Sequence, residues 1–459
     1  MASGTATTPV QEYSYARPSS LDGGLLGLST SGGTTAAGPQ ARPRFFSGLL
    51  TEAAPAAAAL LALADVAQTR YYQPRPTTMR DPVVTCNGDR LRMESFSACC
   101  GVYGRLDVLQ AALDGEVHER GTTNVDVNGP LREALARVGT GDPLHLAVGA
   151  EELAVTTLDG AVVEKKVPLP DRWLRGFAEL QVITSGFDLR AEVSGPEAVR
   201  FLRGLPGGRA RGTLWVVPAG RSLRISSRPG PGAVSLAGPD RLRTMLPLLR
   251  FARALRAYGP AVTARDGGPV ASAWELELPG MRYVLTLSPE PHRGFSGEGA
   301  VLDALATEEA ADDAELLGAL LSFEARVEPD LLAERAGIDA RRTRAALTQL
   351  GTAGRVGYDT AEAGFFHREL PYDPERVAAM NPRLRNARAL AASGGVRFTG
   401  PDLAVVGTGD RSRQVRFSGD QASCTCRWWA EYRGGRGPCK HVIAARLVRD
   451  AALAEEGAR

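Results

Sequence analysis

The stretch CTCRWWAEYRGGRGPCKH, residues 424–441, is the most structure-specific part of the sequence. It places Cys424 and Cys426 one residue apart and, after twelve further residues, repeats that spacing with Cys439 and His441. Three thiolates and one imidazole form the closed tetrahedral ligand set of a structural zinc ion. We expect the first pair on one face of a strand and the second at the start of a helix over 442–449. The sequence therefore predicts one Zn²⁺ held by these four side chains. The ion would replace the hydrophobic core that so small a module cannot build.

This pattern resembles the SWIM zinc finger, a family defined by CxC followed at variable distance by CxH. All four ligand positions match, Lys440 supplies the usual basic residue between the last two, and the resemblance covers roughly 395–450. It implies a ββα-type finger that binds DNA or other proteins, in bacteria as well as in eukaryotes. The alternative for the cysteines is a pair of disulfides or a reactive thiol cluster. Nothing at the N-terminus indicates export to a compartment where disulfides persist.

Positive charge is concentrated around the predicted finger. The formal net charge is +2, whereas residues 383–449 carry thirteen Arg or Lys against four acidic residues, which gives +9 there and −7 for the rest. A basic module on an acidic body is typical of a protein that contacts phosphate. The residues predicted to contact nucleic acid are Arg427, Arg433, Arg436 and Lys440. The competing explanation is compositional, because only three residues of the chain are Lys and arginine is the default base.

Three aromatic residues, Trp428, Trp429 and Tyr432, alternate with these arginines. Aromatic side chains among arginines stack the bases of single-stranded nucleic acid. They can equally cover a zinc site and fill a small core. Packing is favoured for one tryptophan, and both interpretations stay open for the other.

Length and composition indicate two to four domains with hydrophobic cores, since the chain has 459 residues of which 44% are hydrophobic. Residues 1–40 lack the basic start and apolar core of a signal peptide. The alanine-rich run over 55–64 is too short to span a bilayer. We therefore expect a soluble, cytoplasmic protein without a membrane partner.

The predicted organisation is a disordered segment over 1–48, a β-rich α+β body over 49–295, a winged-helix-like segment over 300–372, the finger over 395–450 and a tail over 451–459. A helix over 49–70 opens the body. Later a strand leads three times into a Gly-Pro step and a helix, at Gly129-Pro130, Gly195-Pro196 and Gly238-Pro239. These strand–helix–strand–strand units resemble, at the level of pattern, the repeats of sliding-clamp-like folds. Proline at a helix start is common, however, and the offsets are irregular.

Between 312 and 370 the pattern predicts three short helices. The first covers 316–321, the second covers 329–336, and the third begins after Asp339, which caps it. Two strands, over 356–358 and 365–368, would then form a wing. Such a segment resembles a winged helix, which in DNA-binding members places its third helix in the major groove. The candidate contacts in that helix are Arg341, Arg342 and Arg344. Many winged helices instead dock proteins, and the acidic residues over 308–315 favour that alternative.

No sequence motif supports catalysis. The phosphate loop G-x-x-x-x-G-K-[ST] needs a lysine, and none of Lys165, Lys166 and Lys440 lies in that context. Cys86, Cys99 and Cys100 have no histidine at ligand spacing and are predicted to be buried small hydrophobic residues. We therefore predict a non-catalytic zinc protein that binds nucleic acid, with DNA favoured over RNA. No small-molecule substrate is evident from the sequence. The alternative is an adaptor in a bacterial multi-protein system, in which the finger and the winged helix dock proteins.

Overall fold

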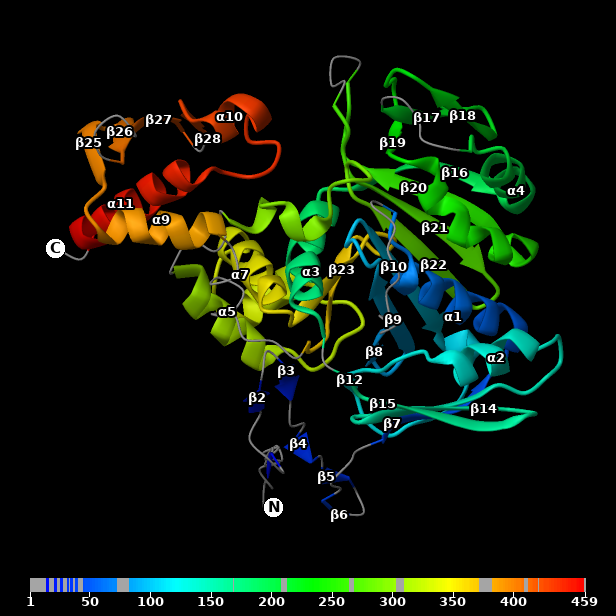
Figure 1. Ribbon diagram of the computed structural model, residues 1–459. Helices are drawn as coiled ribbons and strands as arrows, with labels where there is room; N and C mark the ends of the chain where they lie inside the picture. Colours follow the sequence, from blue (N-terminus) through cyan, green and yellow to red (C-terminus); the bar gives the residue numbers. More distant parts are fainter. Residues whose placement is uncertain are drawn as a thin grey trace, which may run out of the picture.

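The computed structural model has mixed α and β architecture (Figure 1). It describes residues 44–71, 82–167, 169–207, 213–263, 268–302, 309–370, 382–407, 412–419 and 421–457. It also describes six short strands, β1 (Ser14–Tyr15), β2 (Ser20–Asp22), β3 (Leu25–Gly27), β4 (Ser31–Gly32), β5 (Thr34–Thr35) and β6 (Gly38–Pro39). None of the described helices combines the length and the apolar character needed to cross a lipid bilayer.

Most of the segment predicted to be disordered, 1–48, lies outside the described residues. Its last five residues do not, and there the prediction was wrong. They belong to strand β7 (Arg44–Leu50), which buries Phe45 and Phe46. Burial of two aromatic side chains offsets the entropy of ordering this segment.

The body is built on an eight-stranded antiparallel sheet in the order β12-β8-β9-β10-β22-β21-β20-β16. A five-stranded sheet, β11-β7-β13-β14-β15, and a three-stranded sheet, β18-β17-β19, flank it. The strands are β8 (Val83–Cys86), β9 (Arg90–Phe96), β10 (Val102–Leu109), β11 (Leu113–Val117), β12 (Gly121–Asn124), β13 (His145–Gly149), β14 (Glu152–Thr157), β15 (Gly160–Lys165), β16 (Asp188–Ser194), β17 (Leu214–Ala219), β18 (Ser222–Ser226), β19 (Val234–Leu236), β20 (Ala254–Gly259), β21 (Ser272–Leu278) and β22 (Met281–Leu287).

Helices of the body follow several of these strands. They are α1 (Ala53–Gln68), η1 (Gln110–Ala112), α2 (Gly129–Arg137), α3 (Asp171–Thr184), α4 (Gly195–Arg203), η2 (Pro239–Phe251), η3 (Phe295–Gly297) and η4 (Ala300–Leu302). At each Gly-Pro step a strand precedes a helix: β12 precedes α2, β16 precedes α4 and β19 precedes η2. The third helix is a 3₁₀ helix with Pro247 inside it, a residue that cannot donate a backbone hydrogen bond.

Helix α1 is the core helix of the body. Its sequence, AAPAAAALLALADVAQ, has small or aliphatic side chains on every side, and nearly all of them are buried. The helix packs on β9 and β10, where a Cβ on Gly104 would lie 2.9 Å from Leu63. It begins at Ala53, later than predicted, because the preceding residues belong to β7 and to the turn after it.

Residues 309–370 form three helices and a two-stranded antiparallel sheet. The elements are α5 (Glu309–Leu320), α6 (Pro329–Ala336), α7 (Ala340–Thr352), β23 (Val356–Asp359) and β24 (Gly364–His367). The Asp339 side chain caps α7 as predicted, because it accepts hydrogen bonds from the backbone N–H groups of Arg341 and Arg342. The helices share a core that includes Leu317, Leu332 and Leu347.

The β23–β24 sheet packs on the outer face of the eight-stranded sheet. On that face Arg92 lies opposite Asp107, and Asp107 lies opposite Arg282. Asp359 accepts hydrogen bonds from Arg92 at 2.9 Å, from Arg105 at 2.7 Å and from Arg282 at 3.1 Å. A buried charge network therefore joins the 309–370 unit to the body.

Residues 382–457 form a further unit with its own core. Its elements are α9 (Pro382–Ala392), the four-stranded sheet β25 (Val396–Gly400), β26 (Leu403–Val406), β27 (Arg413–Ser418) and β28 (Gln421–Cys424), then α10 (Arg427–Tyr432) and α11 (Lys440–Gly457). The predicted ββα arrangement corresponds only to β27, β28 and α11. Leu384, Val406, Phe417 and Ile443 are buried together, so this unit has a hydrophobic core in addition to the cysteine cluster.

Helix α3 lies between these parts (Figure 1). Its Trp173 and Phe177 are buried against Phe96 of the sheet. Its Gln181 donates a hydrogen bond to the carbonyl of Thr348 in α7. Its Glu179 accepts one from the backbone N–H of Ala300, at 2.7 Å, next to Gly299, which the finger contacts.

Candidate metal centre

The four predicted ligands meet at one point of the C-terminal unit. Cys424 ends β28, Cys426 is the N-cap of α10, and Cys439 and His441 lie at the start of α11. One ligand atom of each lies within 4.8 Å of the others. The Nδ1 atom of His441 lies 3.8 Å from Sγ of Cys424 and 3.9 Å from Sγ of Cys439. Zn–S bonds of about 2.3 Å in a tetrahedron set ligand atoms roughly 3.8 Å apart, so the arrangement fits zinc.

The three thiols influence one another's protonation through hydrogen bonds. A hydrogen bond from Cys424 lowers the pKa of Cys439 to about 4, against the effect of burial. The same contact, with burial, raises the pKa of Cys424, while burial raises the pKa of Cys426. The N–H of Trp429 lies 3.4 Å from Sγ of Cys426 and donates to it, which stabilises a thiolate there. A Zn²⁺ ion would be held by four protein ligands, which suits a structural ion and leaves no position for water.

The glycine-rich turn between the two halves of the site contacts the body. Gly437 has a φ of 72°, and a Cβ there would lie 2.0 Å from the carbonyl oxygen of Gly299. Arg383 of α9 reinforces this contact, since it donates hydrogen bonds to the carbonyl oxygens of Glu298 at 2.6 Å and of Arg436 at 2.6 Å. Sequence reasoning missed Arg383, because both of its partners are far from it along the chain.

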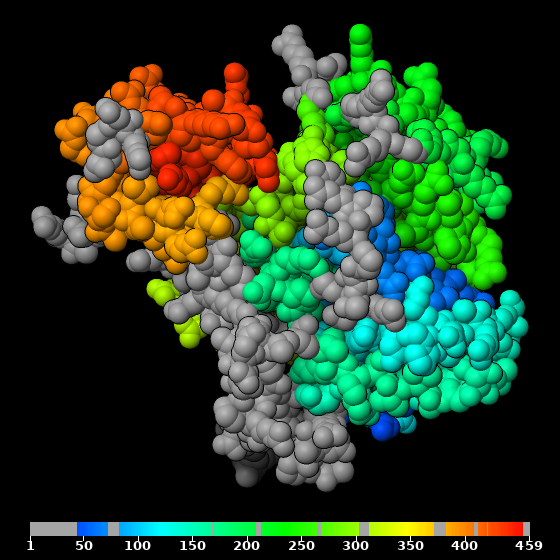
Figure 2. Space-filling view, in the orientation of Figure 1, coloured from blue at the N-terminus to red at the C-terminus, as the bar shows by residue number. Residues whose placement is uncertain are grey.

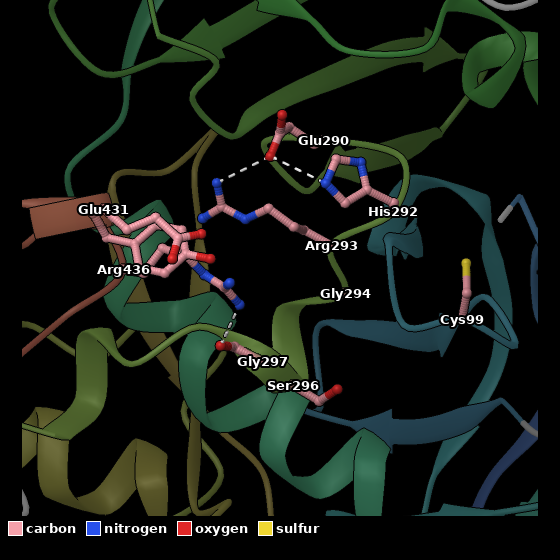
Figure 3. A pocket seen from close by; sticks show the side chains of 10 residues that line it. Cys99, Glu290, His292, Arg293, Gly294, Ser296, Gly297, Glu431 and Arg436 are labelled. Carbon is pink, nitrogen blue, oxygen red and sulfur yellow. Dashed lines mark hydrogen bonds and ion pairs between the residues drawn. The ribbon is translucent and has the colours of Figure 1, made fainter. Parts of the chain in front are cut away.

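The aromatic residues of α10 contribute to the same contact. Arg383 lies over the Trp428 ring at 4.4 Å, and Arg436 lies between Trp428 and Tyr432, at 5.3 and 5.0 Å. Arg436 also donates a hydrogen bond to the carbonyl oxygen of Gly297 at 2.8 Å (Figure 3). Trp429, like Trp428, packs on the core of the finger unit. Both tryptophans therefore have packing roles.

A cavity of about 470 Å³ lies beside this contact (Figure 3). Glu290, His292 and Arg293 line it from the body, and Glu431 and Arg436 line it from the finger. Its two arginines already have protein partners: Arg293 pairs with Glu290 and Glu298, and Arg436 binds Gly297.

The predicted nucleic-acid contacts have different environments. Arg427 and Arg433 are exposed beside the cysteine cluster, Lys440 is half-buried, and Arg436 is bound to the body. In α7, Arg341 and Arg344 are exposed, whereas Arg342 makes a two-point ion pair with Asp313, at 2.8 and 2.6 Å.

The second cysteine group has the predicted character in part. Cys86 and Cys100 are buried, and burial raises their pKa values to about 11 and about 12. Cys99 is half-buried and lines the cavity described above.

Comparisons with known proteins agree with the geometry of the metal centre. Residues 410–448 match the family model of the SWIM zinc finger. No curated protein matches the chain. Among solved structures, Proliferating Cellular Nuclear Antigen from Entamoeba histolytica is similar at 10% identity and a TM-score of 0.35, over 54% of this chain and 100% of that chain. Nothing about function follows from a similarity this distant. The match and the Cys₃His cluster within it identify residues 410–448 as a SWIM zinc finger that fits one Zn²⁺.

Proposed function

We propose that this chain is a non-catalytic zinc protein whose SWIM finger binds double-stranded DNA through its phosphates. Zinc would hold the turn between β28 and α11 rigid, so that Arg427, Arg433 and Lys440 keep a fixed arrangement. Arg436, bound to Gly297, would act on DNA indirectly, by fixing α10 against the body.

The observation that carries this proposal is the unpaired positive charge of the finger. Arg385, Arg388, Arg397, Arg416, Arg427 and Arg433 are exposed or nearly so. Over the described part of the chain none of these guanidinium groups has an ion pair or a side-chain hydrogen bond. Guanidinium groups that no acidic side chain neutralises attract phosphate and release counterions when they bind it.

Fluorescence anisotropy of a labelled duplex, titrated with the zinc-loaded full chain at several KCl concentrations, tests the proposal. We expect the triple variant Arg427→Gln, Arg433→Gln, Lys440→Gln to bind more weakly. The slope of log K against log salt should fall by about 0.9 for each lost phosphate contact. Absence of binding by the parent chain at low salt would rule the proposal out.

The 309–370 unit supports a second candidate function, docking of a protein. It resembles a winged helix in element order, but α3 covers the C-terminal half of its third helix. A Cβ on Gly351 would lie 1.6 Å from Gln181, and Gln181 binds the carbonyl of Thr348. Insertion of all of α7 into a major groove would require α3 to move, and only Arg341 and Arg344 at its start are free to approach a phosphate. A stoichiometric protein partner that survives nuclease treatment in a pulldown would favour the adaptor role.

A further inference from the structure

A second basic region lies far from the finger in the sequence. Residues 195–253 contain eleven arginines and only two acidic residues, Glu197 and Asp240, out of 52 in the whole chain. A general preference for arginine over lysine explains why the basic residues here are arginines. It does not explain why the segment has so few acidic residues. The net charge of this segment is +9, which equals that of residues 383–449 and leaves −16 for the remainder.

The described residues of this segment form one lobe of the body. It consists of α4, the β18-β17-β19 sheet and η2, and its core includes Phe201, Leu236 and Leu242. One of its arginines, Arg241, is buried and structural, since it donates to carbonyl oxygens of Gly101 and Ser288. The other described arginines of the lobe are exposed: Arg200, Arg203, Arg221, Arg224, Arg228, Arg243, Arg250 and Arg253.

The two acidic residues neutralise only two of these arginines. Arg200 pairs with Glu197 at 2.6 Å, and Arg243 pairs with Asp240 at 2.7 Å. The six others, Arg203, Arg221, Arg224, Arg228, Arg250 and Arg253, have no ion pair within the ranges that the structure describes.

Arg256, just beyond the lobe, is neutralised by acidic side chains, unlike most arginines of the lobe. It pairs with three acidic residues, Glu192, Glu275 and Glu277, each within 2.9 Å. Arginines of the adjoining sheet are thus neutralised, whereas most of those on the lobe are not. The lobe therefore presents a positive field to solvent.

We infer that this lobe is a second phosphate-binding surface, which takes double-stranded nucleic acid together with the finger. The inference rests on the proposed function of the finger and extends it to a separate part of the fold. Figures 1 and 2 place the lobe, in green, and the finger, in orange and red, on opposite sides of the same end of the molecule. A long duplex is therefore a better occupant than a small anion, because it can contact both.

The chemistry of the lobe favours phosphate contacts over base contacts. Its Trp215 and Phe201 are buried, and Phe251 is half-buried beneath Arg250 at 4.6 Å. No fully exposed aromatic ring is thus offered for base stacking among the described residues of the lobe. We expect binding that is sequence-independent and strongly salt-dependent.

The test compares two triple variants of the zinc-loaded full chain in the anisotropy assay with a labelled duplex of about 30 base pairs. The lobe variant is Arg221→Gln, Arg224→Gln, Arg228→Gln. The control, with the same change in net charge at exposed arginines outside the lobe and the finger, is Arg137→Gln, Arg326→Gln, Arg335→Gln. We expect the salt slope of the lobe variant to fall by roughly 2 to 3 units and that of the control to stay near the parent value.

Equal slopes for the lobe variant and the control would overturn the inference. The finger variant is the triple variant Arg427→Gln, Arg433→Gln, Lys440→Gln. If it still bound more weakly than the parent chain in that case, the proposed function of the finger would stand. Absence of binding by the parent chain would instead remove the proposed function, and the lobe inference with it. Residual salt-dependent binding by the finger variant, abolished when the lobe substitutions are added, would support the lobe as an independent site.

Discussion

Single residues of the metal centre should control a limited part of the structure. We expect Cys424→Ser to lose about one equivalent of zinc, because three ligands hold the ion much less tightly than four. Loss of metal should loosen residues 424–441 but leave the core around Leu384 and Phe417 folded. Metal analysis and hydrogen exchange measure these two effects.

Cys86→Ser is the control, since Cys86 is buried in the body and belongs to no ligand cluster among the described residues. It should keep the zinc. Full zinc occupancy in the Cys424→Ser protein would contradict the assigned ligand set.

A buried histidine should make stability depend on pH. Burial, with the charge of Arg355, lowers the pKa of His367 to about 3. Its Nδ1 accepts a hydrogen bond from the backbone N–H of Phe323 at 2.7 Å, which requires a neutral ring. The folded pKa lies below the ordinary value of 6.5, so the unfolded chain takes up the proton more readily. The contribution to stability is therefore present above about pH 6.5 and is lost as pH falls toward 3.

His367→Asn keeps an acceptor but cannot be protonated. Urea unfolding between about pH 7 and pH 4 should show a smaller loss of stability in this variant than in the parent chain. The same substitution at His118, which is more exposed, is the control for replacing a histidine by asparagine. Parallel curves for the parent chain and His367→Asn would show that this ring does not titrate as expected.

The ligands were predictable from sequence, whereas the contacts of Arg436 and Gly437 were not. Ligand spacing is local, and its chemistry is specific to thiolates and imidazole. Arg436 binds Gly297, 139 residues away, and a glycine-rich turn gives no sign of which backbone it approaches. Arginine among aromatic residues has the same sequence pattern whether it faces nucleic acid or its own chain.

At the scale of elements, the turn before α11 should determine how the finger is held on the body. Gly437→Ala would place a methyl group against Gly299 and would force alanine into a left-handed conformation, at a cost of about 1–2 kcal/mol. We expect zinc to be retained, because the ligands are unchanged, while hydrogen exchange increases over 295–302.

Gly400→Ala is the matched control, because a Cβ there meets nothing within 4 Å. It should alter neither zinc content nor exchange. Loss of zinc in Gly437→Ala would mean that the turn is needed to form the site rather than to dock it.

The β23–β24 sheet should depend on one carboxylate. The guanidinium groups of Arg105, Arg92 and Arg282 hold the pKa of Asp359 well below its ordinary range, despite burial. Asp359→Asn keeps the shape and removes the charge, which leaves excess positive charge in a buried network. We expect the free energy of unfolding to fall by about 3–5 kcal/mol in urea titrations.

Asp89→Asn, which removes a half-exposed ion pair with Arg90, is the control and should cost less than about 1 kcal/mol. Similar losses for the two variants would show that the buried network does not hold this unit in place.

In the 309–370 unit, local sequence signals predicted where α6 and the two strands begin and end. They did not predict which of these elements would be buried. Helix α6 has the predicted bounds, since Pro329 begins it and Gly337, with a φ of 67°, ends it. The strands of the small sheet also lie within a residue or two of the prediction. Burial of that sheet could not be predicted, because it depends on charged rows formed by β9, β10 and β22 of another unit.

For the whole molecule, the sequence prediction of a basic finger on an acidic body was too coarse. The value of −7 outside the finger is the sum of a lobe at +9 and a remainder at −16. The signal was present in the composition of residues 195–253, but averaging over the body concealed it. Folding then separates the two basic regions, so that the lobe and the finger lie on opposite sides of one end of the molecule (Figure 2).

Two phosphate-binding surfaces on one molecule should make affinity depend on the length of the duplex. A duplex that reaches both surfaces makes the second contact intramolecular and gains its effective concentration, whereas a short duplex of about 8 base pairs engages one surface at a time. Affinity of the parent chain should therefore rise steeply once the duplex spans both. For the Arg221→Gln, Arg224→Gln, Arg228→Gln variant, affinity should rise with duplex length only in proportion to the number of positions at which the finger can bind. Anisotropy titrations with duplexes of about 8 to 40 base pairs at constant salt measure both curves, and parallel curves would mean that the finger and the lobe never hold one duplex together.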